Sequence, residues 1–148
     1  MTASDRLSAF NKHRCNVPNK GKYLNYMSEW WLNNTRHIID NHLIWSKGRH
    51  MVVKKTKRVP LEVIVRGYLT GSSKTSIWKM YEQGERRMYD IDFPDGMEQH
   101  QKLDKPILTP TTKDDDDLPI TPNEILEQNL ITKKEWDFIS NTALKLFE

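Results

Sequence analysis

Several features that would define a class of protein are scarce in this sequence or missing from it. Its 148 residues contain one cysteine, Cys15, so the chain can form neither an internal disulfide nor a site of several thiolates. No apolar run approaches the ~18 residues of a membrane span. The first residues, MTASDRLSAF, lack the charged-then-apolar order of a signal peptide. These absences favour a soluble cytoplasmic protein and argue against secretion.

Patterns of metal hydrolases and of triad enzymes are missing as well. The sequence has no H-E-x-x-H motif, no C-x-x-C pair and no Ser-His-Asp ordering. His37 and His42 are five residues apart, which misses the i, i+4 spacing of helical metal ligands, so we interpret them as ordinary imidazoles. Asp114–Asp117 lack the alternating ligands and the glycine of a calcium loop, which favours a solvated acidic loop. The sequence therefore predicts no metal-ligating residue.

Charge is present but unevenly distributed along the chain. Residues 1–60 hold 12 Lys and Arg against 3 Asp and Glu, whereas residues 61–148 hold 11 against 17. A basic first part suits phosphate-bearing partners, which include both nucleotides and nucleic acids. The basic run Lys54–Arg58 fits either a nucleic-acid patch or a strand beside a nucleotide cleft.

Periodicity and turn residues predict a mixture of helices and strands. We expect a helix at 23–42 with an aromatic stripe in the core, a strand within 50–57 after a unit that ends at 46–48, a strand at 61–66, a helix at 76–83, a loop-rich stretch at 85–120, and two helices opened by capping boxes at Thr121 and Thr132.

The segment 61–72 combines a strand with a turn suited to an anion. Alternation separates an apolar face from a face with two opposite charges: Leu61, Val63 and Val65 against Glu62, Ile64 and Arg66. Gly71 permits close backbone approach, and the hydroxyl of Ser72 can donate to an anion. Arg66 therefore either binds an anion near this turn or forms an ion pair with Glu62.

A longer stretch, Val59–Ser72, reads V-P-L-E-V-I-V-R-G-Y-L-T-G-S. It resembles the first sequence signature of the SAICAR synthetases: aliphatic-aliphatic-Pro-aliphatic-Glu-x-aliphatic-Val-Arg-x-x-x-small-Gly-Ser. Every position from Val59 onward matches, whereas Arg58 stands where a second aliphatic residue is usual. The stretches at 4–10, 20–31 and 107–113 also resemble family motifs in order and spacing, so the resemblance spans essentially the whole chain.

The resemblance implies a SAICAR synthase-like α+β fold of two lobes, related to kinase-like architecture. Residues 1–59 would belong to the smaller, nucleotide-binding lobe and residues 60–148 to the larger, substrate-binding lobe. The implied activity is that of a purine-biosynthesis ligase, which uses ATP and Mg²⁺ to condense carboxyaminoimidazole ribotide with L-aspartate and releases SAICAR, ADP and phosphate. Its partners would be these small molecules rather than nucleic acid or a membrane, and the family is compatible with an oligomer.

Family positions also imply which side chains form the site. Substrate contacts would come from Arg66, Ser72, Lys113, Asp5, Ser8 and Glu62, and contacts to adenine from Lys54, Arg58 and Val59. The same residues are compatible with simpler roles: Asp5 and Ser8 as turn or cap residues, and the lysines of 54–59 as exposed positions of a β-hairpin. No catalytic residue is assigned.

Some family segments do not occur within these 148 residues: the glycine-rich G-K-V-R-D segment, the D-x-K-x-E-F-G segment and the D-x-S-R-x-W segment. The chain thus resembles the central part of the family, truncated at both ends. Asn11 replaces an aspartate of the family, and the acidic run at 114–117 is shorter than the family's loop and lacks its His-Asp pair.

Two alternatives to a working ligase stay open, a truncated relative that only binds the ribotide and a basic nucleic-acid-binding module. For the truncated chain we expect weak ribotide binding, no ligase turnover, and self-association through bare strand edges.

Overall fold

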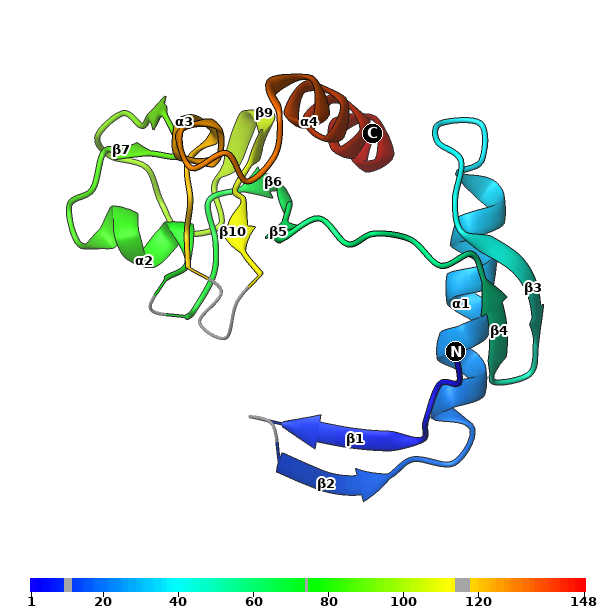
Figure 1. The fold of residues 1–148 in the computed structure, drawn as a ribbon. Helices are drawn as coiled ribbons and strands as arrows, with labels where there is room; N and C mark the ends of the chain where they lie inside the picture. The colour runs from blue at the N-terminus through cyan, green and yellow to red at the C-terminus, as the bar shows by residue number, and fades with distance from the viewer. Residues whose placement is uncertain (10–11, 74, 114–117) are drawn as a thin grey trace. The chain divides into compact units, whose positions relative to one another are not determined.

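The protein consists of two compact units. The structure, a computed structural model, describes residues 1–9, 12–73, 75–113 and 118–148. The chain divides between Lys57 and Arg58 into a first unit, Met1–Lys57, and a second unit, Arg58–Glu148. Each unit combines helices with antiparallel strands, as an α+β chain requires (Figure 1). The division expected after residue 59 lies close to this boundary, and the roles of the two parts stay predictions.

The first unit contains one helix and two β-hairpins. Its elements are β1 (Arg6–Ala9), β2 (Lys12–Asn16), α1 (Lys20–Asn34), β3 (Leu43–Lys47) and β4 (His50–Val53). β1 pairs with β2, and β3 pairs with β4, both antiparallel. The hairpin of β3 and β4 corrects the expectation that a unit ends at 46–48: Ser46 and Lys47 end β3, and the chain turns at Gly48 and Arg49, where Gly48 adopts a φ of 61° that glycine tolerates best.

The first residues of the chain extend this second hairpin. The amino group of Met1 donates to the Met51 carbonyl at 2.7 Å, and the Met51 N–H donates to the Met1 carbonyl at 3.0 Å. Thr2 forms an antiparallel bridge with His50. Residues 1–3 therefore lie along β4 on the side opposite β3.

Helix α1 is shorter than its sequence pattern predicts. It ends at Asn34, not near residue 42. Both the N–H and the hydroxyl of Thr35 donate to the Trp31 carbonyl, and the Asn41 side chain donates to the Leu32 carbonyl at 2.6 Å. Side chains and a turn thus bind the carbonyls at the helix end, so the helix does not continue.

The predicted burial of the aromatic stripe on α1 is wrong within the described chain. Leu24, Met27 and Trp31 are 43%, 56% and 57% exposed. The buried positions of α1 are Gly21 and Asn25, which are one helical turn apart. The second hairpin therefore covers a narrow, polar side of the helix, and the apolar stripe has the right spacing but no cover from the described residues.

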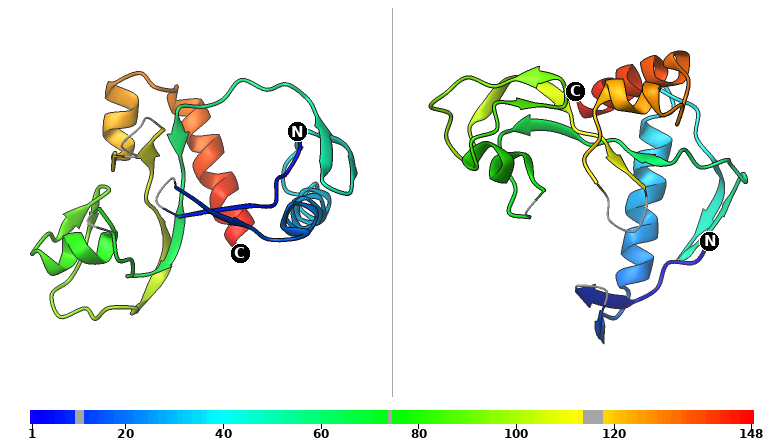
Figure 2. Two further views of the ribbon diagram at one scale, coloured as in Figure 1. Left: turned by 90° about the horizontal axis from the view of Figure 1, so that it is seen from below. Right: turned by 60° about the vertical axis from the view of Figure 1, so that its left-hand side comes forward.

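The second unit is built around a long antiparallel ribbon. Its strands are β5 (Leu61–Glu62), β6 (Val65–Tyr68), β9 (Lys102–Leu108) and β10 (Thr111–Thr112). β5 pairs with β10 and β6 with β9. The predicted strand at 61–66 is therefore two short strands that lie directly beside 107–112. Helix α4 (Lys133–Phe147) contacts β6 and β9, and the views in Figure 2 show it beside this pair.

Shorter elements complete the second unit: α2 (Ile77–Glu82), β7 (Arg87–Met88), β8 (Ile91–Asp92) and α3 (Pro122–Glu127). Two apolar cores result. One gathers residues of α2 and of the β7–β8 and β9 regions, including Leu69, Tyr89 and Ile107, and the other gathers Ile120, Ile125 and Trp136. Strand β9 contributes to both cores, because Ile107 belongs to the first and Leu108 packs against the second.

The predicted helix starts of the second unit are confirmed. Thr121 and Thr132 each accept a hydrogen bond from the N–H three residues on, and Glu124 and Glu135 bond back to the cap N–H groups. Both are complete capping boxes. Ser76 caps α2 in the same way, with its hydroxyl accepting from the Lys79 N–H. None of the helices in the described residues is both long and apolar enough to cross a membrane.

Candidate functional site

Arg66 is held in place by a buried hydroxyl. It lies on β6 opposite Ile107 of β9, and its Nε donates to the Thr109 Oγ1 at 3.0 Å. Thr109 is fully buried, and its own hydroxyl donates to the Ile64 carbonyl at 3.3 Å. Among the described residues, the two terminal nitrogens of Arg66 have no hydrogen-bond partner. The guanidinium is therefore oriented through its Nε, while the N–H groups of its two terminal nitrogens stay available to a ligand.

Tyr89 lies near this arginine and was not identified from the sequence. It is 7% exposed and belongs to the same apolar core as Ile107. Burial raises the pKa of Tyr89 above its usual value, while the charge of Arg66 acts in the opposite direction. Its φ of 54° is rare for an aromatic residue. The only sequence signal was the Tyr89-Asp90 pair between two short strands, which does not resemble the Asn-Gly type of turn.

Glu62 and Lys113 meet on the same ribbon. Their side chains form an ion pair at 2.9 Å, and both are about half exposed. Glu62 lies opposite Thr111, two residues before Lys113. The ion pair of Glu62 with Arg66 that the strand alternation allowed is not among those formed by the described residues, because Glu62 pairs across the ribbon instead of along it.

Ser72 follows a backbone turn that requires glycine. Gly71 has a φ of 123°, and a Cβ at this position would lie 2.4 Å from the Ser76 Cβ. Ser72 is exposed, a few residues before the N-terminus of α2. The hydroxyl is therefore presented to solvent from a loop whose backbone path only glycine allows.

Asp5 has a clear structural role in the first unit. Its carboxylate accepts from the Gly21 N–H at 2.9 Å and from the Arg49 Nη2 at 2.9 Å. The bond from Gly21, followed by that from Arg49, lowers the pKa of Asp5. Asp5 thus ties the N-terminus of α1 to the β3–β4 turn, and substrate contact by Asp5 stays a prediction.

Ser8 lies on β1 and, unlike Asp5, shows no structural role for its side chain among the described residues. Its Oγ is buried and has no hydrogen-bond partner among the described residues. Buried hydroxyls are normally satisfied, so this atom is compatible with a partner outside the described residues. The predicted ribotide contact of Ser8 stays a prediction.

The residues predicted to contact adenine lie in the exposed segment at the unit boundary. Lys54, Arg58 and Val59 are all exposed. The Lys54 N–H donates to the His42 carbonyl at 2.8 Å, which continues the second hairpin by one residue. Arg58 and Val59 lie in the connector. Their role with adenine stays a prediction.

The described residues contain no cluster of several possible metal ligands. No group of three or more histidine, cysteine or acidic side chains lies close enough together in them to hold a metal ion. The four aspartates at 114–117 and Asn11, which replaces a family aspartate, lie outside the described residues. The use of Mg²⁺ stays a prediction.

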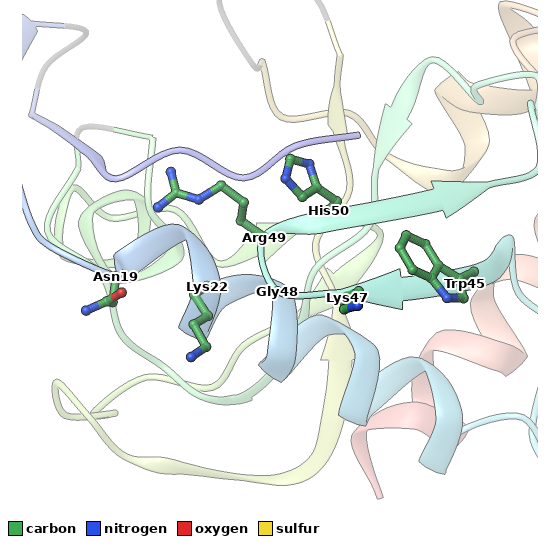
Figure 3. Close-up of a pocket in the computed structure, with 7 residues that line it drawn as sticks. All are labelled: Asn19, Lys22, Trp45, Lys47, Gly48, Arg49 and His50. Carbon is green, nitrogen blue, oxygen red and sulfur yellow. The ribbon is translucent and has the colours of Figure 1, made fainter.

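A basic pocket lies in the first unit between the start of α1 and the β3–β4 turn. Figure 3 shows the residues that line its volume of about 520 Å³: Asn19, Lys22, Trp45, Lys47, Gly48, Arg49 and His50. None of these residues was identified as a site from the sequence, because the β3–β4 hairpin that brings them to α1 was not predicted.

The fold and the site together define a class: an α+β protein of two units whose second unit presents an oriented arginine and an exposed glycine-serine turn. Comparison with known proteins narrows this class. A sequence model of the SAICAR synthetase family matches residues 1–148. The chain belongs to the SAICAR synthetase family.

Three related proteins illustrate the match. The phosphoribosylaminoimidazole-succinocarboxamide synthase of Legionella pneumophila (strain Paris) is 45% identical over 150 residues, covering 100% of this chain and 48% of that protein. The SAICAR synthase of Saccharomyces cerevisiae, solved in complex with SAICAR, has a TM-score of 0.82 and 30% identity over 99% of this chain and 54% of that one.

A third, a type-2 SAICAR synthetase solved in complex with ADP, has a TM-score of 0.74 at 23% identity over 99% of this chain and 57% of that chain, which shows the shared fold. The chain therefore spans about half the length of the relatives it matches.

Proposed function

We propose that this chain is part of an ATP-dependent ligase of purine biosynthesis, which condenses carboxyaminoimidazole ribotide with L-aspartate and releases SAICAR, ADP and phosphate. Family membership supports the reaction class, and the yeast relative was solved with SAICAR. The relative solved with ADP supports the use of ATP. The observation that carries the proposal for this chain is Arg66, whose Nε is fixed by Thr109 while its outer nitrogens stay available.

The chemistry explains why such an arginine is needed. In the proposed reaction, ATP transfers its γ-phosphoryl group to the ribotide carboxylate. The aspartate amine then attacks the acyl carbon, phosphate leaves, and the amine loses a proton to give the amide. Every reactant is an anion, so binding requires donors that are already oriented. A guanidinium held at Nε offers two parallel N–H donors to a phosphate, the geometry that makes such pairs strong.

The other predicted residues take roles around this anchor. We propose that Ser72 donates its hydroxyl to the ribotide phosphate, and that the Glu62–Lys113 pair contributes to the same substrate site. Asp5 and Ser8 would contribute from the first unit, and Lys54, Arg58 and Val59 would contact adenine. The smaller, nucleotide-binding lobe would then correspond to residues 1–59 and the substrate-binding lobe to residues 60–148.

Two alternatives differ from this proposal in what they predict. A relative that only binds the ribotide would show the same Arg66-dependent affinity without ATP turnover in any form of the protein. A nucleic-acid-binding module would bind through the basic run Lys54–Arg58, with affinity that falls steeply with salt and does not depend on Arg66.

The proposal is tested by titrating the chain with SAICAR in a calorimeter. Arg66→Ala should weaken binding by about tenfold or more, because a hydrogen bond from a charged group contributes about 1.5–3 kcal/mol. The matched control is Arg87→Ala, which removes an exposed arginine of the same unit that pairs with Asp92 at 2.9 Å. Equal affinity of the Arg66 and Arg87 variants would show that Arg66 does not bind the ribotide.

A further inference from the structure

The basic pocket of the first unit is built on a rigid base. Asn25, which is 6% exposed, donates from its side-chain amide to the Ser46 hydroxyl at 2.8 Å, to the Gly48 carbonyl at 3.0 Å and to the His50 carbonyl at 3.3 Å. One buried amide thus fixes the whole β3–β4 turn against α1. Buried polar groups with several partners hold a single geometry, so the side chains around the turn start from fixed positions.

The charge of the pocket is positive and only partly compensated. Arg49 pairs with Asp5 at 2.9 Å, and the His50 ring shares a hydrogen bond with the Thr2 hydroxyl at 3.1 Å. The ammonium groups of Lys22 and Lys47 have neither an ion pair nor a hydrogen bond with any described residue. No acidic side chain is among the residues that line the pocket. An anion would therefore meet two cations that are not already engaged.

An aromatic ring lies near one of these cations, Lys47. Trp45 and Lys47 are two residues apart on β3, so they share a face of the strand about 7 Å apart along it. Trp45 is 50% exposed, and Figure 3 shows it at the opposite end of the pocket from Asn19 and Lys22. An exposed tryptophan offers a surface on which a planar base can stack.

From this arrangement we propose that the pocket binds a nucleoside phosphate, with the phosphate on Lys22 and Lys47 and the base against Trp45. The Asn19 side chain, which does not cap α1, is a further polar group at the phosphate end. A ligand that carries both an anion and a planar ring fits better than either a bare anion or an apolar molecule, because both features line one pocket.

This site is separate from the proposed adenine segment. Lys54 follows the last residue of β4, whereas the pocket surrounds the turn at which β4 begins. Four strand residues separate the two places by about 13 Å along the strand. The inference also does not rest on Arg66 or Ser72, the residues proposed to hold the ribotide phosphate, since it uses no residue of the second unit.

The test uses calorimetry on the full 148-residue chain carrying Arg66→Ala, which weakens binding at the proposed ribotide site. The probes are AMP, inorganic phosphate and adenosine. We expect AMP to bind more tightly than either of the other two. The pair of changes Lys22→Gln and Lys47→Gln should lower AMP affinity about tenfold or more and remove phosphate binding. Trp45→Leu should weaken AMP binding while leaving phosphate binding unchanged.

Two controls decide where a bound ligand lies. Lys145→Gln removes an exposed lysine of the other unit and should change nothing. If Lys54→Gln weakens AMP binding while the Lys22 and Lys47 changes do not, AMP occupies the adenine segment and the inference is wrong. Equal affinity for AMP and phosphate, with no effect of Trp45→Leu, would likewise overturn the nucleotide assignment. Thermal melts of each variant distinguish a loss of ligand binding from a loss of folding.

Discussion

The change Thr109→Val isolates the hydroxyl that orients Arg66. Valine has nearly the same shape as threonine, so the fully buried site keeps its volume and loses only polar contacts. Two side-chain hydrogen bonds disappear, one from the Arg66 Nε at 3.0 Å and one to the Ile64 carbonyl at 3.3 Å. The backbone bond from the Thr109 N–H to Ile64 at 2.9 Å is kept.

The expected loss of stability follows from these two bonds. The bond to the Ile64 carbonyl contributes about 1 kcal/mol net. The bond from Arg66 contributes less than its full value to stability, because water can replace the lost partner of this partly buried arginine. The free energy of unfolding should therefore fall by about 1.5 kcal/mol. For a unit of this size that corresponds to a decrease in Tm of roughly 6–12 °C, measured by circular dichroism. Thr142→Val is the control, because Thr142 only bonds back to the Phe138 carbonyl on α4 and should cost less than about 0.5 kcal/mol.

The effect of Thr109→Val on SAICAR binding shows whether Thr109 orients Arg66 or only stabilises the fold. With Arg66 present, Thr109→Val should weaken SAICAR binding about fivefold to tenfold, since the guanidinium loses its fixed direction. With Arg66→Ala already in place, the same change should have almost no further effect on affinity, because the two side chains act as one group. Unchanged affinity and unchanged Tm in the Thr109 variant would refute the reasoning. Equal losses with and without Arg66 would show that Thr109 acts only on stability.

Two other expectations concern the first unit. Folding lowers the pKa of Asp5 from 3.8, so the stability that its carboxylate contributes is present above the unfolded pKa and is lost as pH falls through the lower folded pKa. In the Asp5→Asn variant, stability should therefore fall less steeply with decreasing pH below about pH 3.8. Thermal melts in which wild type and variant lose stability in parallel over this pH range would contradict this. The exposed stripe of Leu24, Met27 and Trp31 should make the chain self-associate with rising concentration, and Met27→Gln with Trp31→Gln should reduce this in sedimentation velocity. A monodisperse wild-type chain at all concentrations would exclude the second expectation.

Features set by short stretches of sequence were predicted well. The capping boxes at Thr121 and Thr132 depend on residues three positions apart, so a local pattern is sufficient. The β3–β4 hairpin was missed because Ser46-Lys47-Gly48 was interpreted as the end of a unit, although the chain turns at Gly48 and Arg49 and pairs back on itself. Periodicity also predicted the correct stripe on α1 but not its exposure, because burial depends on which segments cover a helix.

The contacts of the candidate site could not be predicted from local pattern. Arg66 and Thr109 are 43 residues apart, and Glu62 and Lys113 are 51 apart. Family resemblance identified Arg66 and Lys113 without indicating their partners. Thr109 lies in the stretch 107–113 that resembles a family motif, yet nothing in its sequence context showed that it is buried or that it supports the arginine.

The Arg66–Thr109 contact lies where β6 and β9 give way to β5 and β10 along the ribbon. The pairs Val65 with Leu108 and Glu62 with Thr111 keep the same register, so the strands on either side of this point belong to one continuous antiparallel arrangement. The N–H groups of Thr109 and Lys113 donate to the Ile64 and Pro60 carbonyls, so position 110 faces away from this ladder and Pro110 costs it no bond. Thr109 donates both its N–H and its hydroxyl to the Ile64 carbonyl. The oxygen of the same hydroxyl accepts from the Arg66 Nε, so one buried residue both continues the ladder and orients the arginine.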